Sequence, residues 1–278
     1  MRTLCLCADD FGLSDGVCSG ILQLVRQQRL QAVSVLAGGA AWPRWAPMLL
    51  AEPAVRDGRV AVGLHFNLTD GQPLAGELRA VWPRFPGLLS LLARAHLRWL
   101  PVAGLRAEWR AQWDAFAAAA GRPPDYVDGH QHVHHLPLVR DVVLHGLQDE
   151  RQSPGATGRI AVRSTAHMLG PGHGFKRWVI AHSGGRALGH RLLAQGLSHN
   201  ASLSGAYDFA ATDYRALMQA WLARLPERGG MLFCHPGEAD ASVPDAIAQA
   251  RVRELSYLRS DAFADDLSAA GVTLGPAW

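Results

Sequence analysis

Short apolar runs rich in β-branched residues alternate along the chain with longer stretches whose apolar positions recur at helical spacing. This alternation is typical of a parallel sheet covered by helices. The predicted strands are Thr3–Ala8, Ala32–Ala37, Val60–Phe66, Tyr126–Val133, Arg159–Arg163, Met231–His235 and Val272–Leu274. The predicted helices are Asp15–Gln28, Pro43–Ala51, Ala103–Ala120, Leu138–Glu150, Asp213–Leu225 and Ala246–Ala270. About seven such units favour an α/β fold of the (β/α) barrel type over an open sheet, as a single domain over residues 1–278.

Two stretches break this pattern. Thr69–Pro86 and Ala166–Ala211 are rich in Gly, Pro, Ser and His, and we interpret them as active-site loops or a flap, inserted near residues 69–105 and 166–211. Within the first insertion, Leu88–Leu100 is apolar on one helical face with Arg and His opposite. For this segment we favour a helix packed on the barrel over a contact with a membrane surface.

Composition limits the class of protein. Hydrophobic residues make up 49% and charged residues 18% of the 278, as in a globular enzyme. The net charge of +3 is not gathered in a Lys/Arg run, so we expect no nucleic-acid partner. The four cysteines follow no metal or disulfide spacing and are interpreted as reduced, mostly buried thiols; they are Cys5, Cys7, Cys18 and Cys234.

Targeting signals are not evident in the sequence. The chain enters a strand without a charged and apolar leader, and no apolar run reaches the length of a membrane span. We therefore expect a cytoplasmic protein. Nine tryptophans and the apolar helix would allow a homodimer.

Acidic and imidazole side chains follow four of the predicted strands. The segments are ADDFG from Ala8, GLHFNLT from Gly63, DGHQHVH from Asp128 and CHPGE from Cys234. Because a (β/α) barrel assembles its active site at the carboxyl ends of its strands, we expect these segments to form one site.

Two adjacent carboxylates, Asp9 and Asp10, end the first predicted strand, although like charges repel and are costly to bury. A divalent cation would take one as a ligand and cancel much of the repulsion, which leaves the other free to accept a proton. Neighbouring strand residues point to opposite sides, so the two would have different roles unless the strand breaks there. The residues alone leave open which aspartate is the ligand.

The stretch DGHQHVHH places Asp128, His130, His132 and His134 at alternate positions, which would line one face of an extended chain. Positions two apart on a strand are separated by about 6–7 Å, so only one or two of these histidines can reach one ion. We expect the others to support the ligands or contact substrate. Two neutral histidines and one carboxylate, with open positions for water, form a hydrolytic metal site.

Two further histidines close apolar strands. His65 is the last residue but one of VAVGLHF, and His235 ends MLFCH before a Pro-Gly turn. Taken alone, His65 is best interpreted as a hydrogen-bonded structural residue, but its place among the other strand ends favours a metal ligand. For His235 we favour a proton donor to a departing amine over a turn-capping residue. Cys234 is expected to face away from the site.

Together these motifs resemble the carbohydrate deacetylases of the YdjC type, which include chitooligosaccharide deacetylases and a hopanoid-biosynthesis branch. The resemblance runs in order through ADDFGLS, GLHFNLT, DGHQHVHHLP, Val162-Arg163, CHPGE and Arg253-Glu254-Leu255. It implies a distorted (β/α) barrel that removes the acetyl group from an N-acetylated amino sugar, in an oligosaccharide or a glycolipid. It also implies a divalent metal, Mg²⁺ or Zn²⁺.

The resemblance also assigns roles by position. It implies that Asp10, His65 and His130 bind the metal, that Asp9 is the general base, and that His235 is the general acid. The chemistry of the residues had left the two aspartates interchangeable, so this distinction rests on the family.

Three other residues are expected close to the reaction. We expect His132 and Arg163 to contact the substrate and Asp128 to hold an imidazole in its useful tautomer. The commoner form of the third motif is DSHHHVH, so Gly129 and Gln131 depart from it. Both fall between the alternating residues, and we expect them on the opposite face, away from the ligands.

Other functions could use the same residues. A metal-dependent amidohydrolase or phosphoesterase is one alternative, although no basic pocket motif favours phosphate. A catalytically silent sugar- or metal-binding module is another, and it would be indicated by the loss of Asp9 or His235, which are both present. Leu88–Leu100 resembles the hopanoid-associated branch more than the chitooligosaccharide enzymes, so the identity of the sugar stays open.

Overall fold

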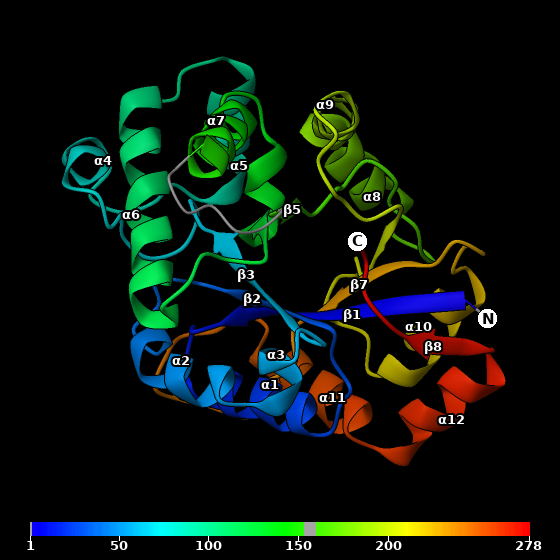
Figure 1. Ribbon diagram of the computed structural model, residues 1–278. Coiled ribbons are helices and arrows are strands. Elements are labelled where there is room, and N and C mark those ends of the chain that lie inside the picture. The colour runs from blue at the N-terminus through cyan, green and yellow to red at the C-terminus, as the bar shows by residue number, and fades with distance from the viewer. Residues whose placement is uncertain (1, 153–159) are drawn as a thin grey trace.

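One curled sheet of parallel strands organises the protein (Figure 1). The computed structural model describes residues 2–152 and 160–278. Its strands are β1 (Arg2–Phe11), β2 (Ala32–Val35), β3 (Ala61–Phe66), β4 (Tyr126–Gly129), β5 (Ala161–Val162), β6 (Leu203–Ser204), β7 (Gly230–Cys234) and β8 (Val272–Leu274). Their order is β5-β4-β3-β2-β1-β7-β6, with β8 paired to the start of β1. The predicted barrel of about seven parallel strands is confirmed as a curled half-barrel.

The strands at the two edges of the sheet, β5 and β6, are its shortest. Each has two residues. Single bridges, Val162 to His199 and Met168 to Leu203, connect this side of the barrel within the described part of the chain. We did not predict β6, because two residues are too few to show a periodic pattern.

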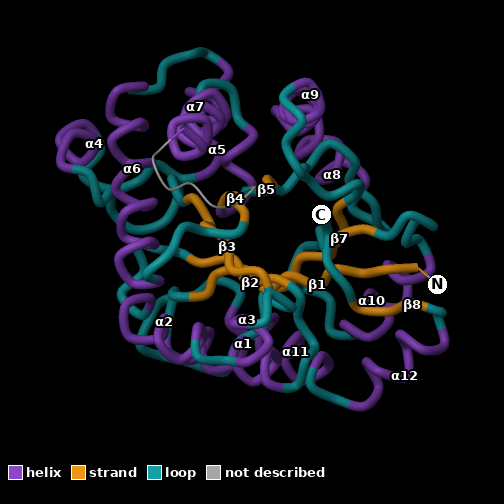
Figure 2. The backbone as a smooth tube through the Cα atoms, in the orientation of Figure 1, coloured by secondary structure: helices purple, strands orange, loops and turns teal. Residues whose placement is uncertain are grey.

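Helices cover both sides of the sheet. They are α1 (Asp15–Arg26), α2 (Trp42–Leu50), α3 (Pro53–Arg56), α4 (Gly76–Val81), α5 (Leu88–His96), α6 (Val102–Ala120), α7 (Val139–Gln152), α8 (Gly174–Ile180), α9 (Arg186–Ala194), α10 (Tyr214–Ala223), α11 (Ala248–Leu258) and α12 (Asp261–Ala269). Figure 2 shows α1, α2, α3 and α11 on one side and α5, α7, α8 and α9 on the other. Within residues 2–152 and 160–278, no helix is both long and apolar enough to cross a bilayer.

Two helical predictions need correction. The long helix expected at Ala246–Ala270 is two helices, α11 and α12, because Ser260 takes extended dihedral angles (φ −80°, ψ 162°) and begins a new helix before Asp261. The irregular segment expected at Ala166–Ala211 contains α8, α9 and β6, joined in part by a π-helical turn at Ala181–Gly185.

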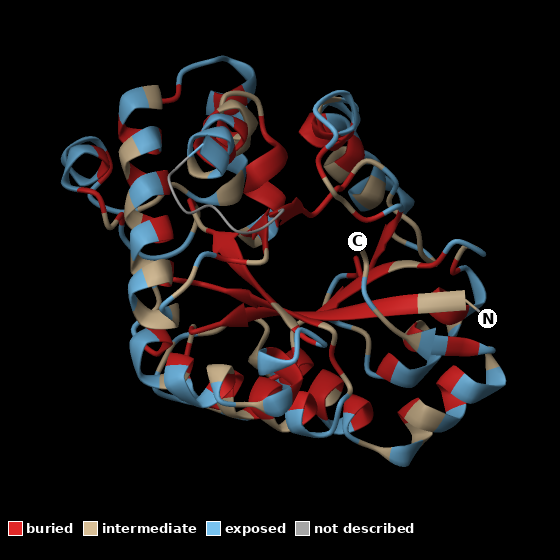
Figure 3. Ribbon diagram, in the orientation of Figure 1, coloured by how far each residue is buried: buried red, intermediate tan, exposed pale blue. Residues whose placement is uncertain are grey.

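Side-chain alternation along β1 separates two parts of the core. Leu4 and Leu6 pack in the large cluster between the sheet and the helices, whereas Cys5 and Cys7 belong to a smaller cluster with Tyr126. Figure 3 shows that buried residues follow the strands through the centre of the molecule. All four cysteines are unpaired and buried, in line with the sequence.

Candidate metal centre and active site

Strand β1 continues beyond the predicted end at Ala8 and carries both aspartates. Its register against β2 shifts between Ala8 and Phe11, and Asp10 adopts a left-handed φ of 71°. This conformation costs about 1–2 kcal/mol for most residues and is best tolerated by Asp and Asn. The bulge allows Asp9 and Asp10 to line the same cavity, whereas a regular strand would point them to opposite sides.

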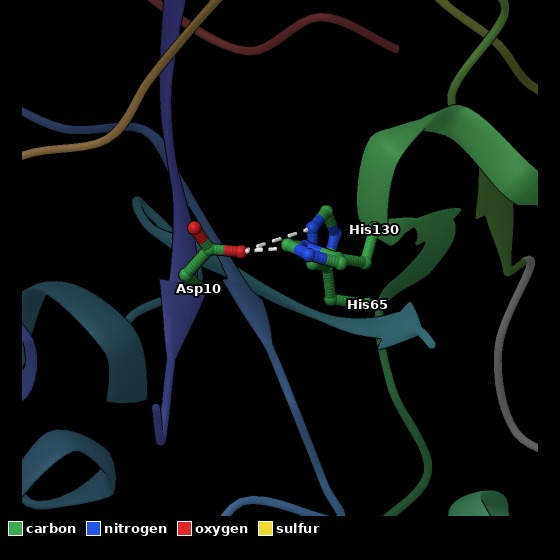
Figure 4. Close-up of side chains that lie close together, drawn as sticks. All are labelled: Asp10, His65 and His130. Carbon is green, nitrogen blue, oxygen red and sulfur yellow. Dashed lines mark hydrogen bonds and ion pairs between the residues drawn. The ribbon is translucent and has the colours of Figure 1, made fainter. Parts of the chain in front are cut away.

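Asp10, His65 and His130 converge from three strand ends (Figure 4). Oδ1 of Asp10 lies 3.4 Å from Nε2 of His65 and 3.0 Å from Nδ1 of His130. In a tetrahedral site with bonds of 2.0–2.1 Å, ligand atoms are about 3.3 Å apart. The donor atoms and their spacing therefore fit a divalent cation.

Further contacts orient His65 and Asp10. Nδ1 of His65 lies 2.6 Å from Oδ1 of Asp128, which leaves Nε2 facing Asp10 and His130. Oδ2 of Asp10 accepts a hydrogen bond from Arg251 at 2.8 Å, so Oδ1 is the atom that faces the histidines. Arg251 also donates through Nε to Asp245 at 2.6 Å. The imidazole that Asp128 contacts is therefore that of His65.

Neighbouring charges counteract the effect of burial on the pKa values of His65 and Asp10. Burial alone would lower the pKa of His65, but Asp128 and Asp9 raise it to about 10. Burial would raise the pKa of Asp10, but Arg251 and His130 hold it well below its usual range. In the absence of a cation, Asp10 is therefore ionised and His65 carries a proton that a cation must displace.

Arg163 binds the Asp9 carboxylate. The guanidinium donates to the two Asp9 oxygens at 2.8 and 2.6 Å, and it lies 2.7 Å from Asp128. Burial would raise the pKa of Asp9, but the charge and hydrogen bonds of Arg163 hold it below its usual range. Arg163, expected to contact substrate, is fully buried outside the cavity lining and contacts Asp9.

His235 follows β7 and lines the same cavity. Its backbone N–H donates to Oε2 of Glu254 at 2.6 Å, and Glu254 also accepts from the Tyr207 hydroxyl. Its ring meets the Phe209 ring edge to face, with centroids 5.1 Å apart. Burial lowers the pKa of His235 to about 4, so the resting imidazole is neutral at pH 7. Burial raises the pKa of Glu254 to about 7.

The third motif is not the extended segment that we predicted at Tyr126–Val133. Strand β4 ends at Gly129, and His130–His135 form a 3₁₀ helix in which Gln131 and His132 are left-handed, with φ of 51° and 63°. The chain therefore turns directly after His130, and the single face of alternating histidines does not exist. Of this row, His130 joins the cluster, whereas His134 is buried with Nε2 2.8 Å from the Arg163 carbonyl oxygen.

The two departures from the commoner motif are Gly129, which ends β4, and Gln131, which lies in this turn. Gly129 and Gln131 both line the cavity, so the expectation that they lie on the opposite face is wrong. At Gly129 an added Cβ would lie 2.8 Å from the His134 backbone nitrogen, which leaves no room for the more usual serine. His132 also lines the cavity, and its Nδ1 is buried without a hydrogen-bond partner in the described structure.

The cavity that holds these groups has a volume of about 670 Å³. Its wall combines the polar cluster with apolar side chains from α5 and α8, among them Leu88, Phe175 and Val179. Lys176, the only lysine of the chain, also lines it and donates to the Tyr207 carbonyl at 2.6 Å. A cavity of this size and mixed lining suits an organic ligand with one polar and one apolar part.

A second group of potential metal ligands lies apart from Asp10, His65 and His130. Cys7, Asp9 and Asp128 come close together, and all three are buried. The Arg163 guanidinium already occupies their midst, with Nη2 2.9 Å from the Cys7 sulfur. Because this cation is paired with both carboxylates, we interpret the group as an ion-pair network that supports the cluster of Asp10, His65 and His130.

Sequence reasoning missed Arg251 and Asp245, and it gave Glu254 no role. Arg251 and Glu254 are three residues apart on α11 and are both buried. An Arg and a Glu at helical spacing are usually a solvated surface pair. The signal that could have distinguished them is their position among the apolar residues of the inner face, with Leu255 and Leu258.

Comparisons with known proteins match nearly the whole chain. The family model described as YdjC-like protein matches residues 3–269. A chitooligosaccharide deacetylase of Klebsiella pneumoniae (strain 342) is 27% identical over 99% of this chain and 97% of its own length. A chitooligosaccharide deacetylase of Yersinia enterocolitica is 33% identical over 51% of this chain and 54% of its own length. A solved structure from Enterococcus faecalis V583, described as a candidate cellobiose-phosphate cleavage protein, shares the fold with a TM-score of 0.72 at 18% identity, covering 99% of this chain and 97% of that one.

Proposed function

The chain belongs to the YdjC-like protein family, and we propose that it is a metal-dependent hydrolase that removes the N-acetyl group from an amino sugar and releases acetate. The observation that carries the proposal is the meeting of Asp10, His65 and His130 beside Asp9 in one cavity. The Klebsiella relative, named a chitooligosaccharide deacetylase, supports it, because the match extends over nearly all of both chains.

The metal would be held by Oδ1 of Asp10, Nε2 of His65 and Nδ1 of His130. A divalent cation supplies Lewis-acid chemistry, which polarises an amide carbonyl and makes water more acidic. One carboxylate and two imidazoles suit Zn²⁺, and Mg²⁺ is the second candidate. The metal content of protein purified without chelators would distinguish them.

Asp9 is the general base in this proposal. It adjoins Asp10, faces the cavity, and has both oxygens fixed by Arg163. It accepts the proton of the water that attacks the acetamide carbon. Because its pKa lies below the usual range, it keeps that proton only transiently. Arg163 acts through Asp9 and is a positioning residue.

His235 is the general acid, which donates a proton to the sugar nitrogen as the C–N bond breaks. Its resting imidazole is neutral at pH 7, so it must gain that proton during the cycle. Asp9 and His235 interact electrostatically, and transfer of the water proton from one to the other would supply it. The products are acetate and the free amino sugar.

The apolar part of the cavity favours an N-acetylated glycolipid over a plain oligosaccharide. Leu88, Phe175 and Val179 line it on the side of α5 and α8. A sugar hydroxyl placed against this wall would lose its hydrogen bonds to water without replacement. An apolar aglycone would lie there at no such cost, with the sugar at the polar end near His132 and Gln131.

Acetate release tests the proposal. Metal-loaded protein is incubated with an N-acetylglucosamine oligosaccharide and with an N-acetylated glycolipid. Asp9→Asn should lower the rate about 10²–10⁴-fold while the metal stays bound. Asp57→Asn, at an exposed aspartate outside the cavity, is the control. Full activity of Asp9→Asn would refute the assignment of the base.

Other substrates test the alternatives. Turnover of a phosphomonoester or of a non-sugar amide, without turnover of either N-acetylated sugar, would indicate one of the other hydrolases. Sugar binding without turnover in the metal-loaded protein would indicate the silent binding module.

A further inference from the structure

Exposed apolar side chains concentrate on two segments that flank the cavity. In the described structure nine large hydrophobic side chains are exposed, and seven of them lie within residues 81–99 or 175–193. The seven are Val81, Leu89, Leu97, Trp99, Phe175, Trp178 and Leu193. Trp99 is 71% exposed and Phe175 79%. Large exposed apolar side chains concentrated in two segments that both reach one cavity are typical of an interaction site.

Charge on these segments and on the residues around them has one sign. Residues 78–107 and 164–207, here called the rim segments, contain nine Lys or Arg and no Asp or Glu. The whole chain has 27 Lys or Arg and 24 Asp or Glu, so the remainder carries 18 against 24. Arg191 is paired with Asp141 of α7, so the positive charge of the rim segments rests on the other eight cations.

Both rim segments reach the cavity. Leu88 of α5 and Phe175 of α8 line it. In Figure 1, α5 and α8 lie on the same side of the sheet, opposite α1 and α11. Helix α5 buries Leu91 and leaves Leu89 82% exposed, so it packs on the body through one face, as predicted, and keeps another free.

We propose that the rim segments dock the protein on the surface of an anionic lipid bilayer. Protruding aromatic and leucine side chains among Arg and Lys are the composition that binds a bilayer interface: the apolar groups enter the acyl boundary and the cations meet lipid phosphates. Arg94 and Arg98 beside Leu97 and Trp99 provide both parts in one short stretch.

A second copy of this chain fits the rim less well. A symmetric dimer uses the same patch on both partners, so it would bring two surfaces of positive charge together. Lipid phosphates supply the opposite charge. The cavity would then open beside the bilayer, and an amphiphilic substrate could reach it without crossing water; this last consequence rests on the proposed function, whereas docking does not.

Vesicle flotation tests docking on the full chain without substrate. We expect the protein to float with POPC vesicles that contain about 30% POPG, and to bind pure POPC at least about tenfold more weakly. Binding should weaken steeply as NaCl rises from about 0.05 to 0.5 M. Absence of flotation with the anionic vesicles at low salt would overturn the proposal.

Matched variants locate the surface. Leu89→Ser/Trp99→Ser/Trp178→Ser should reduce vesicle partitioning at least about tenfold. Met48→Ser/Val252→Ser changes the two exposed apolar residues outside the rim and should have no effect. Arg94→Glu/Arg98→Glu should weaken binding to POPG vesicles and leave binding to POPC unchanged. Circular dichroism and urea unfolding check that each variant is folded.

Two results would contradict the proposal despite folded variants. One is an equal loss of partitioning in the Met48/Val252 control. The other is a triple variant that changes from dimer to monomer in sedimentation while its vesicle binding is unchanged, which would make the rim a homodimer interface. Because the readout needs no turnover, failure of docking leaves the deacetylase proposal standing, and loss of acetate release leaves docking standing.

Discussion

Arg163 donates to both oxygens of Asp9, through Nη1 at 2.8 Å and through Nη2 at 2.6 Å. The Arg163 side chain is fully buried, and that of Asp9 is 3% exposed. The guanidinium therefore determines which way the Asp9 carboxylate points into the cavity and keeps it ionised.

Arg163→Lys should lower the turnover number about 10–100-fold, because a single ammonium cannot hold both oxygens of Asp9 in place. KM and metal affinity should change little, since Arg163 touches neither the cavity nor the proposed ligands. Steady-state kinetics and calorimetric metal titration on one preparation check both parts. Arg259→Lys, at an exposed position, is the control. Wild-type turnover in Arg163→Lys would remove the positioning role.

His130→Ala should weaken metal binding at least about 100-fold, because it removes one of the three proposed ligands. His134→Ala should keep metal affinity within a few-fold but cost about 1–3 kcal/mol of the free energy of unfolding, since it leaves the Arg163 carbonyl without its partner. Metal titration and urea unfolding measure the two quantities. The opposite ranking of metal affinities would move the ligand to His134.

Metal affinity should rise with pH. The pKa of His65 is raised to about 10 in the absence of metal, so binding must release its proton below that pH. The apparent affinity should therefore increase about tenfold per pH unit between about pH 6 and 9. Asp128→Asn removes a carboxylate that raises this pKa and should flatten the dependence. Titrations in buffers of different ionisation enthalpy count the released protons, and a count of zero would contradict the expectation.

The free energy of unfolding should contain a term from Glu254 that decreases as pH rises. Burial raises the pKa of this carboxyl from 4.5 to about 7, so the folded state holds its proton more tightly than the unfolded state does. The favourable term is complete below about pH 4.5 and is lost as pH rises through about 7, with a full size of about 3 kcal/mol. Glu254→Gln removes the titration. Urea unfolding at pH 5 and 8 should show a smaller pH difference in the variant; identical differences would exclude Glu254 as the source.

The strands that carry the candidate site could be predicted because apolar runs end abruptly in polar residues. That contrast placed Asp9 and Asp10, His65 and His235 at strand ends, and the structure has them there. The shared edge of a parallel sheet then required the strand ends to meet. The assignment of Asp10 rather than Asp9 as the ligand came from family resemblance.

The pattern of polar and apolar residues could not predict the backbone dihedral angles at the site. Regular alternation would separate Asp9 from Asp10 unless the strand breaks there, and it would align His130, His132 and His134 on one face. The strand does break there, and the single face of histidines does not form. The causes are a bulge with a left-handed Asp10 and a left-handed pair at Gln131 and His132. A pattern of polar and apolar residues does not encode a positive φ at a non-glycine position. Nor does it identify long-range partners such as Arg251, whose burial depends on how α11 packs.

The single lysine on the cavity wall has a practical consequence. Reagents that acylate primary amines can modify only Lys176 and the α-amino group of the chain, so amine coupling to a sensor chip or bead would often tether the enzyme by the edge of its own binding site. Apparent inactivity of such an immobilised sample would then reflect blocked access. Attachment through an engineered tag, or through a cysteine placed on the exposed side of α12, avoids this artefact because the four native thiols are buried.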